Sequence, residues 1–290
     1  MDSEDYKNDT NDEWDLIIRP RSRWMELHLG DLWRYRDLVV LFVRRDFVAQ
    51  FKQTILGPAW FVLQPLITTL MFTIVFGNIA QLSTDGLPKI LFYFSGNLLW
   101  LYFAECLTKT SDTFATNAHL FGKVYFPRLA VPVSIVFSGL LRLGLQFAFF
   151  LVILGYYHFF TPYHLQLTTH LLLFPLLVLL MAGMALGLGV IFSSLTTKYR
   201  DLKFLLEFGV RLLMYATTVI YPLSAIPDKW KWLVLLNPMT SIIETFRLAS
   251  LGVGTFNWWH LGYSAGFTAV ILFLGVLLFS KIERTFMDTV

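Results

Sequence analysis

The sequence predicts an all-α integral membrane protein with six transmembrane helices, and three observations support this fold class. Of the 290 residues, 56% are hydrophobic and only 15% are charged, whereas soluble domains average about 25% charged residues. Long stretches carry no charge at all, and a membrane-spanning helix needs about 20 mostly apolar residues. Lys and Arg gather in alternate loops, as the positive-inside rule expects of a multi-pass protein.

Composition and charge exclude several other classes of protein. Disordered chains are poor in aromatic residues and rich in charge, whereas 17% of this chain is aromatic. The single cysteine, Cys106, excludes a disulfide framework and a zinc site built from several cysteines. The formal net charge of +3 is too small to indicate a nucleic-acid partner. We therefore expect membrane lipids, and no nucleic acid, to surround the chain.

The six spans follow from the stretches without charge. No charged residue stands between Lys52 and Asp85, which predicts the first span. The 55 uncharged residues from Leu143 to Thr197 are too many for one helix, and an interface turn at residues 158–166 divides them into two spans. The predicted spans lie near residues 59–80, 90–110, 131–157, 170–195, 204–222 and 260–280.

The distribution of basic residues orients these spans. Lys and Arg are frequent before the first span, in the loops after the second and fourth spans, and in the tail. By the positive-inside rule, both termini and these two loops are cytoplasmic. The start of the chain is acidic and polar, unlike a secretory signal. We expect residues 1–30 to form a polar tail, residues 58–282 the six-span domain, and residues 283–290 a cytoplasmic tail.

Residues 31–57 predict a helix that lies in the cytoplasmic membrane interface. Apolar and charged residues mix along this segment, so that side chains such as Val39 and Phe42 face lipid while Arg44 stays in water. Gly57–Pro58 then breaks the chain and directs it into the membrane. A plain basic flank of the first span is the alternative interpretation.

Residues 221–252 predict a pair of short helices that re-enter the membrane from the external face. Each apolar piece has about 12–14 residues, too short to span the bilayer, and Asn237–Pro238 divides the two pieces. Nearby tryptophans, including Trp230 and Trp232, suit the interfacial belt of membrane proteins.

Two predicted cytoplasmic loops are too rich in aromatic and charged residues for plain connections. In TNAHLFGKVYFPRLAVP, Pro127 and Pro132 limit any helix to one or two turns, and the aromatic residues form a knob that needs a hydrophobic socket. The loop TTKYRDLKF is a second short element. These loops suggest docking to a soluble motor, and tight turns that pack on their own bundle are the alternative. The candidate docking residues are Phe121, Lys123, Tyr125, Phe126, Arg128, Lys198, Tyr199, Arg200 and Asp201.

Two arginines fall inside predicted spans, where an unpaired charge is costly. Glu207 and Arg211 are spaced i, i+4, which predicts an intramembrane ion pair. Alternatively, Arg211 faces a hydrated pathway. The sequence identifies no partner for Arg142.

Glycine spacing predicts where helices approach one another closely. Gly183 and Gly187 form a G-x-x-x-G face in the fourth span, and Gly262 and Gly266 repeat this spacing in the sixth. We expect a bulky residue at Gly183 or Gly187 to destabilise the helical bundle.

The sequence contains no motif for catalysis, for metal binding or for nucleotide binding. It has no G-x-x-x-x-G-K-[ST] stretch, so the chain is not expected to bind ATP phosphates. The six histidines are dispersed, and no paired carboxylates lie within a predicted span. We therefore expect a component of a larger machine rather than an enzyme, with no metal site and no cofactor bound by this chain.

Four segments resemble the ABC-2-type permeases that export polysaccharides such as O-antigen, capsule or teichoic acid. The resemblance covers nearly the whole chain from about residue 30, although residues 1–30 form a longer preamble than many members have. It implies a bacterial inner-membrane homodimer with twelve spans around a channel, above two copies of a separate ABC ATPase subunit that binds ATP and magnesium. The segments are RRDFVAQFKQTILGPAWFVLQPL (44–66), NAHLFGKVYFPRLAVP (117–132), KYRDLKFLLEF (198–208) and NPMTSIIETFR (237–247).

The resemblance also implies a substrate and a path for it. Such exporters move a lipid-diphosphate-linked glycan, whose phosphates need cations at the cytoplasmic entrance. Arg44, Arg45 and Lys52 suit this role, and anionic lipid headgroups explain them equally well. In this family the first and fifth spans border the channel. The implied lining residues are Trp60, Phe61, Gln64, Phe72, Phe76 and Tyr215.

Two further functions remain open from the sequence. An ABC-2-type exporter of a drug or small lipid predicts ATPase stimulation by small amphiphiles and no glycan accumulation when the chain is deleted. An integral membrane enzyme acting on lipid-linked sugars needs acidic or histidine residues clustered at one membrane face, and the sequence scatters them.

Overall fold

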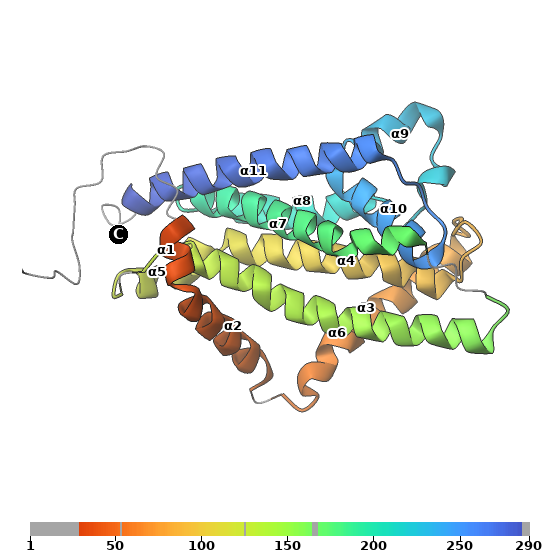
Figure 1. Cartoon of the computed structure of the whole chain (residues 1–290), viewed down its shortest axis with the longest axis horizontal. Helices are drawn as coiled ribbons and strands as arrows, with labels where there is room; N and C mark the ends of the chain where they lie inside the picture. The colour runs from red at the N-terminus through yellow and green to blue at the C-terminus, as the bar shows by residue number, and fades with distance from the viewer. Residues whose placement is uncertain (1–28, 53, 125, 164–167, 286–290) are drawn as a thin grey trace, which may run out of the picture.

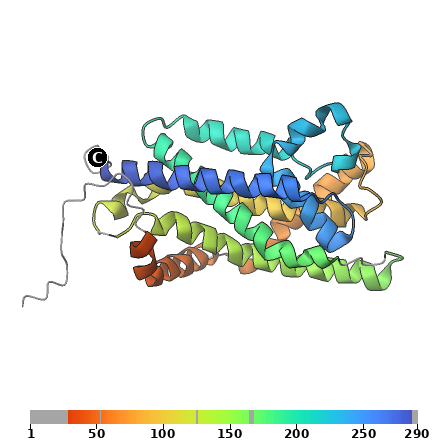
Figure 2. The ribbon, with the colours of Figure 1, turned by 45° about the horizontal axis from the view of Figure 1, so that its top comes forward.

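The computed structural model describes residues 29–52, 54–124, 126–163 and 168–285. Within these residues every regular element is helical, as the sequence predicts. The long helices run side by side and form an elongated bundle (Figures 1 and 2). The predicted tails, residues 1–30 and 283–290, lie largely outside the described residues.

Five segments of the described chain are long and apolar enough to cross a membrane. They correspond to the first four predicted spans and to the sixth. The first consists of the turn Gly57–Ala59, helix α3 (Trp60–Phe72) and the π-helical segment Thr73–Ile79. The others are α4 (Lys89–Ser111), α6 (Ala130–Phe160), α7 (Phe174–Thr196) with the preceding 3₁₀ segment Thr169–Leu173, and α11 (Trp258–Thr285).

Helix α4 occupies the centre of the bundle. Every residue from position 91 to 100 is buried, because α3, α6, α7 and α10 (Pro238–Leu251) pack around α4. In α4, 78% of the apolar stretch is buried inside the protein, compared with 17% in the segment Gly57–Ile79 and 22% in α11. The apolar surfaces of α3 and α11 therefore remain on the outside, where lipid or another subunit covers them.

Helices α7 and α11 approach closely at glycines. A Cβ atom added at Gly187 would lie 2.8 Å from the backbone nitrogen of Leu272, and one added at Gly275 would lie 2.5 Å from the carbonyl oxygen of Gly187. Neither contact involves a flexible side chain, so a larger residue at either position forces the two helices apart.

The two predicted glycine pairs behave differently. A Cβ atom at Gly183 would lie 2.9 Å from Cγ2 of Thr268, so Gly183 and Gly187 both face α11. A Cβ atom at Gly262 or Gly266 meets nothing within 4 Å. The repeated spacing in α11 therefore makes no close contact within the described residues of this chain, where Gly275 supplies the close approach to α7 instead.

The fifth predicted span, near residues 204–222, is not one continuous helix. Helix α8 covers only Leu202–Tyr215, and 14 residues extend about 21 Å, less than the hydrocarbon core of about 30 Å. The chain continues as a buried turn at residues 217–220. In this turn the carbonyl oxygens of Thr218 and Val219 accept hydrogen bonds from Arg247 of α10.

Helices α1 (Leu29–Arg34) and α2 (Arg36–Phe51) lie at the end of the bundle that also holds the last turns of α11 (Figure 1). Helix α2 packs obliquely against α6. Val39 and Phe42 are buried in the protein, whereas Val40 and Leu41 are exposed. The face predicted to contact lipid is therefore divided, and Val39 and Phe42 belong to the protein interior.

Aromatic rings join three helices at this same end. Phe114 of α5 (Thr113–Phe121) stacks on Phe279 of α11 with 4.6 Å between ring centroids. Phe121 contacts both Phe114 and Phe126, at 5.9 and 5.7 Å. Phe126 in turn contacts Phe42 of α2 at 5.7 Å. We call these five residues the aromatic cluster, and it ties α2 and α5 to α11.

The opposite end of the bundle carries α9 (Asp228–Leu235) and α10 (Figure 1). The two short helices are divided at Asn237–Pro238, where Asn237 Oδ1 accepts a hydrogen bond from the Met239 amide at 3.0 Å and caps α10. On α9, Lys231 donates to Asp228 at 2.7 Å, and this hydrogen bond lowers the pKa of the Asp228 carboxyl. The charged tip of α9 is typical of a surface in contact with water.

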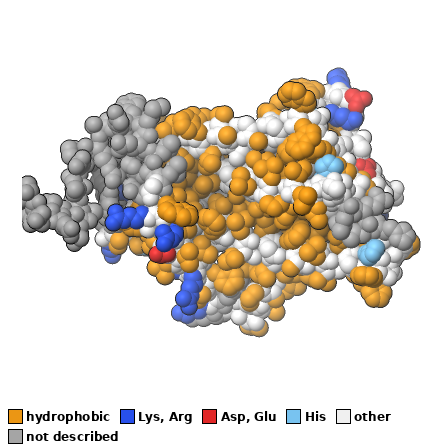
Figure 3. Space-filling view, in the orientation of Figure 1, with side chains coloured by type: hydrophobic (Ala, Val, Ile, Leu, Met, Phe, Trp, Pro, Cys, Tyr) orange, Lys and Arg blue, Asp and Glu red, His pale blue; other side chains and the backbone are white. Residues whose placement is uncertain are grey.

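Charge and apolar surface are segregated along the bundle. Figure 3 shows hydrophobic side chains over the middle of the visible face and Lys or Arg side chains near its two ends. This separation matches a protein whose central band lies in hydrocarbon and whose ends meet water.

Candidate functional site

Helix α3 presents an apolar face to the outside of the bundle. Trp60, Ile67 and Met71 are each about half exposed. Their spacing of seven and four residues places them on one face, together with the exposed Gln64. A mostly apolar exposed face on a membrane-length segment is suited to contact lipid or a second subunit.

The opposite face of α3 is fixed to the bundle through a proline. Pro65 has no N–H, so the carbonyl of Phe61 loses its usual helical donor. Gln146 of α6 donates from Nε2 to this carbonyl at 3.0 Å. Asn97 of α4 donates from Nδ2 to the carbonyl of Pro65 at 3.3 Å. Two buried amide side chains therefore hold the kinked helix in place.

Phe61 differs from the role that the resemblance implied for it. The ring shares the buried face with Pro65 and Thr69, four and eight residues along. It lies against the interior, with the guanidinium carbon of Arg142 5.6 Å from its centroid. Phe61 therefore does not reach the outer face of the chain.

The other five implied lining residues have more accessible positions. Trp60, Gln64 and Tyr215 are exposed. Phe72 and Phe76 are half-buried, and their rings contact each other at 5.5 Å between centroids.

Helix α8 presents a second outer face, which contains a charge. Phe204, Phe208 and Tyr215 are 74%, 60% and 52% exposed, and the exposed Arg211 lies between them at helical spacing. The predicted ion pair is not formed. Among the described residues, the Arg211 guanidinium and the Glu207 carboxylate are not joined by a salt bridge. Within a membrane-spanning segment, an exposed arginine is costly in lipid and favours a water-filled surface.

Arg142 has a partner that the sequence did not identify. Its guanidinium forms an ion pair with Glu105 of α4, and Lys109 Nζ lies 2.7 Å from the same carboxylate. The charge of Asp46 on α2 also acts on Arg142. This group of charges ties α2, α4 and α6 together near the end that carries the aromatic cluster.

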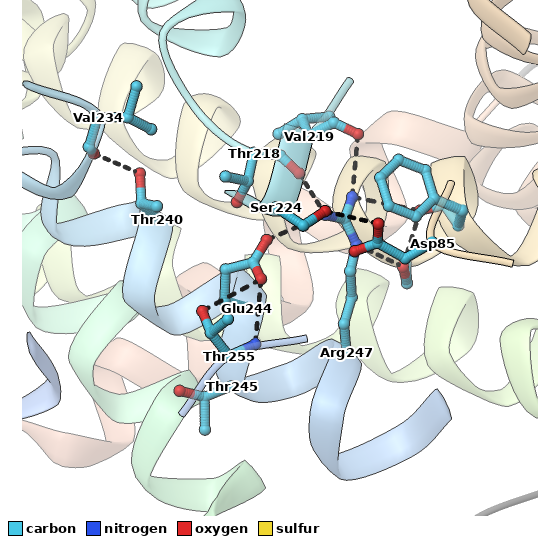
Figure 4. Close-up of polar contacts among 12 residues, drawn as sticks. Asp85, Thr218, Val219, Ser224, Val234, Thr240, Glu244, Thr245, Arg247 and Thr255 are labelled. Atoms are coloured by element: carbon cyan, nitrogen blue, oxygen red, sulfur yellow. Dashed lines mark hydrogen bonds and ion pairs between the residues drawn. The ribbon is translucent and has the colours of Figure 1, made fainter. Parts of the chain in front are cut away.

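A second buried arginine lies near the opposite end of the bundle (Figure 4). Arg247 of α10 is 1% exposed. Its Nη2 donates to the carbonyl oxygens of Val219 at 3.0 Å and Phe92 at 3.4 Å, and its Nη1 donates to the carbonyl of Thr218. A Cβ atom at Gly96 would lie 2.7 Å from Nη2, so only glycine leaves room for the guanidinium there.

Two carboxylates compensate this buried charge. Glu244 Oε1 lies 3.5 Å from Nη1 of Arg247, and Glu244 Oε2 accepts hydrogen bonds from the backbone and hydroxyl of Thr255 at 3.2 and 3.4 Å. Asp85 also acts on Arg247 electrostatically, and it accepts a hydrogen bond from Ser224 at 2.6 Å (Figure 4). The group joins α4, α10 and the turn that ends α8.

The loop after α4 and α5 is largely packed on its own chain. Phe121 and Phe126 belong to the aromatic cluster and are 2% and 6% exposed, and Arg128 is also buried, with its guanidinium 5.5 Å from the Phe121 ring centroid. Their side chains therefore cannot form the proposed docking knob in this conformation. Lys123 is exposed, and Tyr125 lies outside the described residues.

The loop between α7 and α8 is accessible throughout. Lys198, Tyr199, Arg200 and Asp201 are all exposed. Lys198 Nζ lies 5.3 Å from the centroid of the Tyr199 ring. These four candidate docking residues thus offer free aromatic and charged surface.

The three candidate entrance residues lie on or beside α2. Arg44, Arg45 and Lys52 are exposed. Arg45 Nη2 lies 2.8 Å from Asp46, and the Arg45 guanidinium lies 4.7 Å from the centroid of the Phe42 ring. The positive charge of Arg45 is therefore partly offset.

The described residues contain no group of three or more His, Cys, Asp or Glu that could hold a metal ion. The candidate sites in these residues are instead the buried charged groups around Arg142 and Arg247 and the exposed faces of α3 and α8. Glu244 and Arg247 are the functional candidates that the sequence did not single out. Their only local signal is an acid and a base three residues apart inside an otherwise uncharged segment.

The comparisons with known proteins agree with one another. Residues 37–251 match the family model described as "ABC-2 type transporter". The chain is 26% identical to an "O-antigen export system permease protein RfbA" of Klebsiella pneumoniae, over 91% of this chain and 98% of the relative. It is 29% identical to the RfbA of Myxococcus xanthus over 75% of this chain and 81% of the relative. A "Polysialic acid transport protein KpsM" of Escherichia coli is 23% identical over 84% of this chain and 93% of the relative.

Proposed function

The chain belongs to the ABC-2 type transporter family, and from this membership we propose that it is the permease subunit of an ATP-driven exporter of lipid-linked polysaccharide. Relatives that align over more than 90% of their length are named for export of O-antigen or transport of polysialic acid. The cargo proposed here is a glycan on a lipid diphosphate, which moves from the cytoplasm across the bacterial inner membrane.

Six crossings of the membrane are consistent with the path of the chain. Helix α7 ends beside the last turn of α4, since Thr196 donates to the carbonyl of Ser111 at 3.2 Å, and α11 begins at the end that carries α9 and α10 (Figures 1 and 2). Between these points the chain traverses the bundle once more. Helix α8 and the turn after it supply this sixth crossing. Both termini are then on one side, which the basic loops assign to the cytoplasm.

The exposed Arg211 is the observation that carries the proposed conduit. An arginine between Phe208 and Tyr215 on an outer face requires water or a polar partner at membrane depth. Two copies of the chain, with the faces of α3 and α8 turned toward each other, enclose such a hydrated path. Formation of the homodimer would keep Arg211 out of lipid and avoid the free-energy cost of placing its charge there.

Aromatic side chains on these faces suit a sliding polymer. Sugar rings have C–H faces that pack on aromatic rings, and many shallow contacts retain a chain without stopping it. Trp60 and Tyr215 are proposed to make such contacts on these outer faces, with Gln64 as a polar contact. Phe72 and Phe76 are half-buried and pack against the core of the chain, so the proposed contacts do not depend on them. Arg44, Arg45 and Lys52 are proposed to attract the lipid diphosphate on the cytoplasmic side.

Energy is proposed to come from a separate ATPase subunit, two copies of which bind ATP and magnesium. The exposed loop with Lys198, Tyr199, Arg200 and Asp201 is the proposed docking surface, together with Lys123. The neighbouring Phe121, Phe126 and Arg128 support this surface from within, since they are buried in the chain.

Deletion of the gene in its host tests the proposed function. We expect the glycan to disappear from the cell surface and its lipid-linked precursor to accumulate inside. The chain and its ATPase partner should together restore export, whereas a partner that cannot hydrolyse ATP should not. Unchanged surface glycan would overturn the proposal. Unchanged glycan with a gain in sensitivity to amphiphiles would indicate an exporter of drugs or small lipids.

A further inference from the structure

A cavity of about 190 Å³ lies near the end of the bundle that carries α9 and α10. Its wall includes Leu223 after α8, Glu244 of α10, Thr255 and Phe256 of the following loop, and His260 of α11. Four segments between residues 223 and 260 thus meet around one space. Pockets for drug-sized ligands have about 300 Å³ or more, so this cavity suits a single ring.

The floor of the cavity is a carboxylate held in a fixed orientation. The Glu244 side chain is 3% exposed. Arg247 lies on one side of it, and Thr255 donates to it from the other side. A buried acid fixed in this way is a directed acceptor for a ligand hydroxyl group.

Two donors at the mouth of the cavity are not used by the protein. Asn257 Oδ1 caps α11 by accepting from the Trp259 amide at 2.9 Å, which leaves the side-chain NH₂ group of Asn257 for a ligand. The His260 ring has no hydrogen bond within the described residues. The lining therefore offers both acceptors and donors around one space.

An aromatic ring forms one wall. Phe256 lines the cavity, and its orientation is fixed by Trp258, at 4.8 Å between ring centroids and 77° between planes, and by His170 at 4.7 Å. Together with Leu223, it offers apolar surface opposite the polar groups. A ligand with a C–H face and several hydroxyl groups matches both kinds of wall.

Charge separates this ligand from other candidates. The lining contains no Lys or Arg that could attract a phosphate. Its single carboxylate is already compensated by Arg247, and the described residues contain no cluster able to hold a metal ion. A neutral polyhydroxylated ring is the chemistry that remains.

We propose that this cavity binds one neutral sugar residue of the exported glycan as it leaves the conduit. The inference rests on the proposed function for the source of the sugar. Arg247 connects Glu244 to the carbonyl groups of Thr218 and Val219, so the occupied cavity lies against the turn that ends α8. Binding of one ring is weak, which permits the polymer to advance.

The test uses the complete permease in complex with its ATPase partner, purified in detergent. The probes are glucose, galactose, mannose, rhamnose and N-acetylglucosamine, with glycerol and inorganic phosphate for comparison. We expect at least one sugar to raise the thermal unfolding midpoint of the wild-type complex above the value in equimolar glycerol. Phosphate should cause no such shift.

Two conservative variants locate the binding. Asn257→Ser keeps an oxygen that caps α11 but removes the amide donor, and His260→Phe keeps a ring but removes its nitrogens. Both should retain the wild-type midpoint without sugar and lose the sugar-induced shift. Lys229→Ala, on the surface of α9, should keep the shift. Equal shifts in all four proteins, a shift no larger than in glycerol, or a shift with phosphate would overturn the proposal.

The cavity proposal and the proposed function are tested by separate measurements. Export of the host glycan, measured in cells, reports on the function, whereas the sugar-induced shift reports on the cavity. Export without any shift would remove the cavity proposal and leave the exporter intact. A shift without glycan export would support the cavity and overturn the exporter.

Discussion

The guanidinium carbon of Arg247 lies 3.8 Å from the centroid of the Phe92 ring, and Nη2 of the same side chain donates to the Phe92 carbonyl oxygen at 3.4 Å. One arginine thus contacts a single residue of α4 through both its ring and its backbone. Because Arg247 also bonds the last turn after α8, it joins the central helix to the proposed channel helix.

Replacement of Arg247 by alanine should strongly destabilise the protein. The change leaves Glu244 buried without its counter-ion, and removal of one member of a buried pair costs about 3–5 kcal/mol. The double variant Arg247→Met/Glu244→Leu should recover part of this loss because no unpaired charge remains. Thermal unfolding of the detergent-purified protein measures both effects. A wild-type unfolding midpoint for Arg247→Ala would show that the contacts of Arg247 do not stabilise the fold.

Gly187→Ala should lower the unfolding midpoint, and Gly266→Ala serves as its matched control. The new methyl group at position 187 meets the backbone of Leu272 at 2.8 Å, and overpacking of this kind typically costs about 1–3 kcal/mol. A Cβ atom at Gly266 meets nothing within 4 Å, so alanine there gains helix propensity of up to about 1 kcal/mol. Equal midpoints for the two variants would contradict the close packing of α7 on α11.

Gln146→Leu should destabilise α3, and Pro65→Ala should rescue it. The leucine removes the hydrogen bond that Gln146 donates to the buried Phe61 carbonyl, and loss of a buried hydrogen bond costs about 1–3 kcal/mol. Alanine at position 65 restores the backbone N–H that a helix normally supplies to this carbonyl. A double-mutant cycle of thermal unfolding measures the coupling between the two changes. Strictly additive effects would contradict the assignment of Gln146 as the replacement donor.

The sequence predicted much of this fold, because membrane helices follow from local composition. Charge-free stretches correctly located five membrane-length segments, and Asn237–Pro238 correctly divided α9 from α10. The residues around Arg247 could not be foreseen in the same way. Its partners are mainly backbone carbonyls, which every sequence contains, and they come from segments 28 and 155 residues away.

The aromatic loop after α5 shows a second limit of sequence reasoning. Residues such as Phe121 and Phe126 correctly indicate that the loop needs a hydrophobic socket. Composition alone does not say whether a partner or the chain itself supplies that socket. Here the chain itself supplies the socket, because Phe126 contacts Phe42 of α2 and Phe121 contacts Phe114, which stacks on Phe279 of α11.

Two variants should therefore distinguish an effect on ATPase docking from an effect on folding stability. Tyr199→Ala removes an exposed ring, so it should keep the unfolding midpoint and weaken co-purification of the ATPase. Phe126→Ala removes a buried ring from the aromatic cluster. It should reduce the free energy of unfolding by about 3–5 kcal/mol, as large-to-small core changes do, and so lower the midpoint. Co-purification and thermal unfolding are measured on the same preparations. Undiminished co-purification with Tyr199→Ala would exclude that side chain from the docking surface.

Cysteine labelling distinguishes water from lipid at Arg211. The native Cys106 is buried, so it should contribute little background. In membranes that contain the intact complex, Arg211→Cys should react with a water-soluble maleimide, because an unpaired arginine at this depth requires a hydrated surface. Leu179→Cys is the control, since Leu179 is 65% exposed on α7 and carries no charge that demands water.

Labelling should be strong at position 211 and weak at 179. Equally weak labelling at both positions would place the outer face of α8 in lipid, and the conduit would then have to follow another face of the bundle.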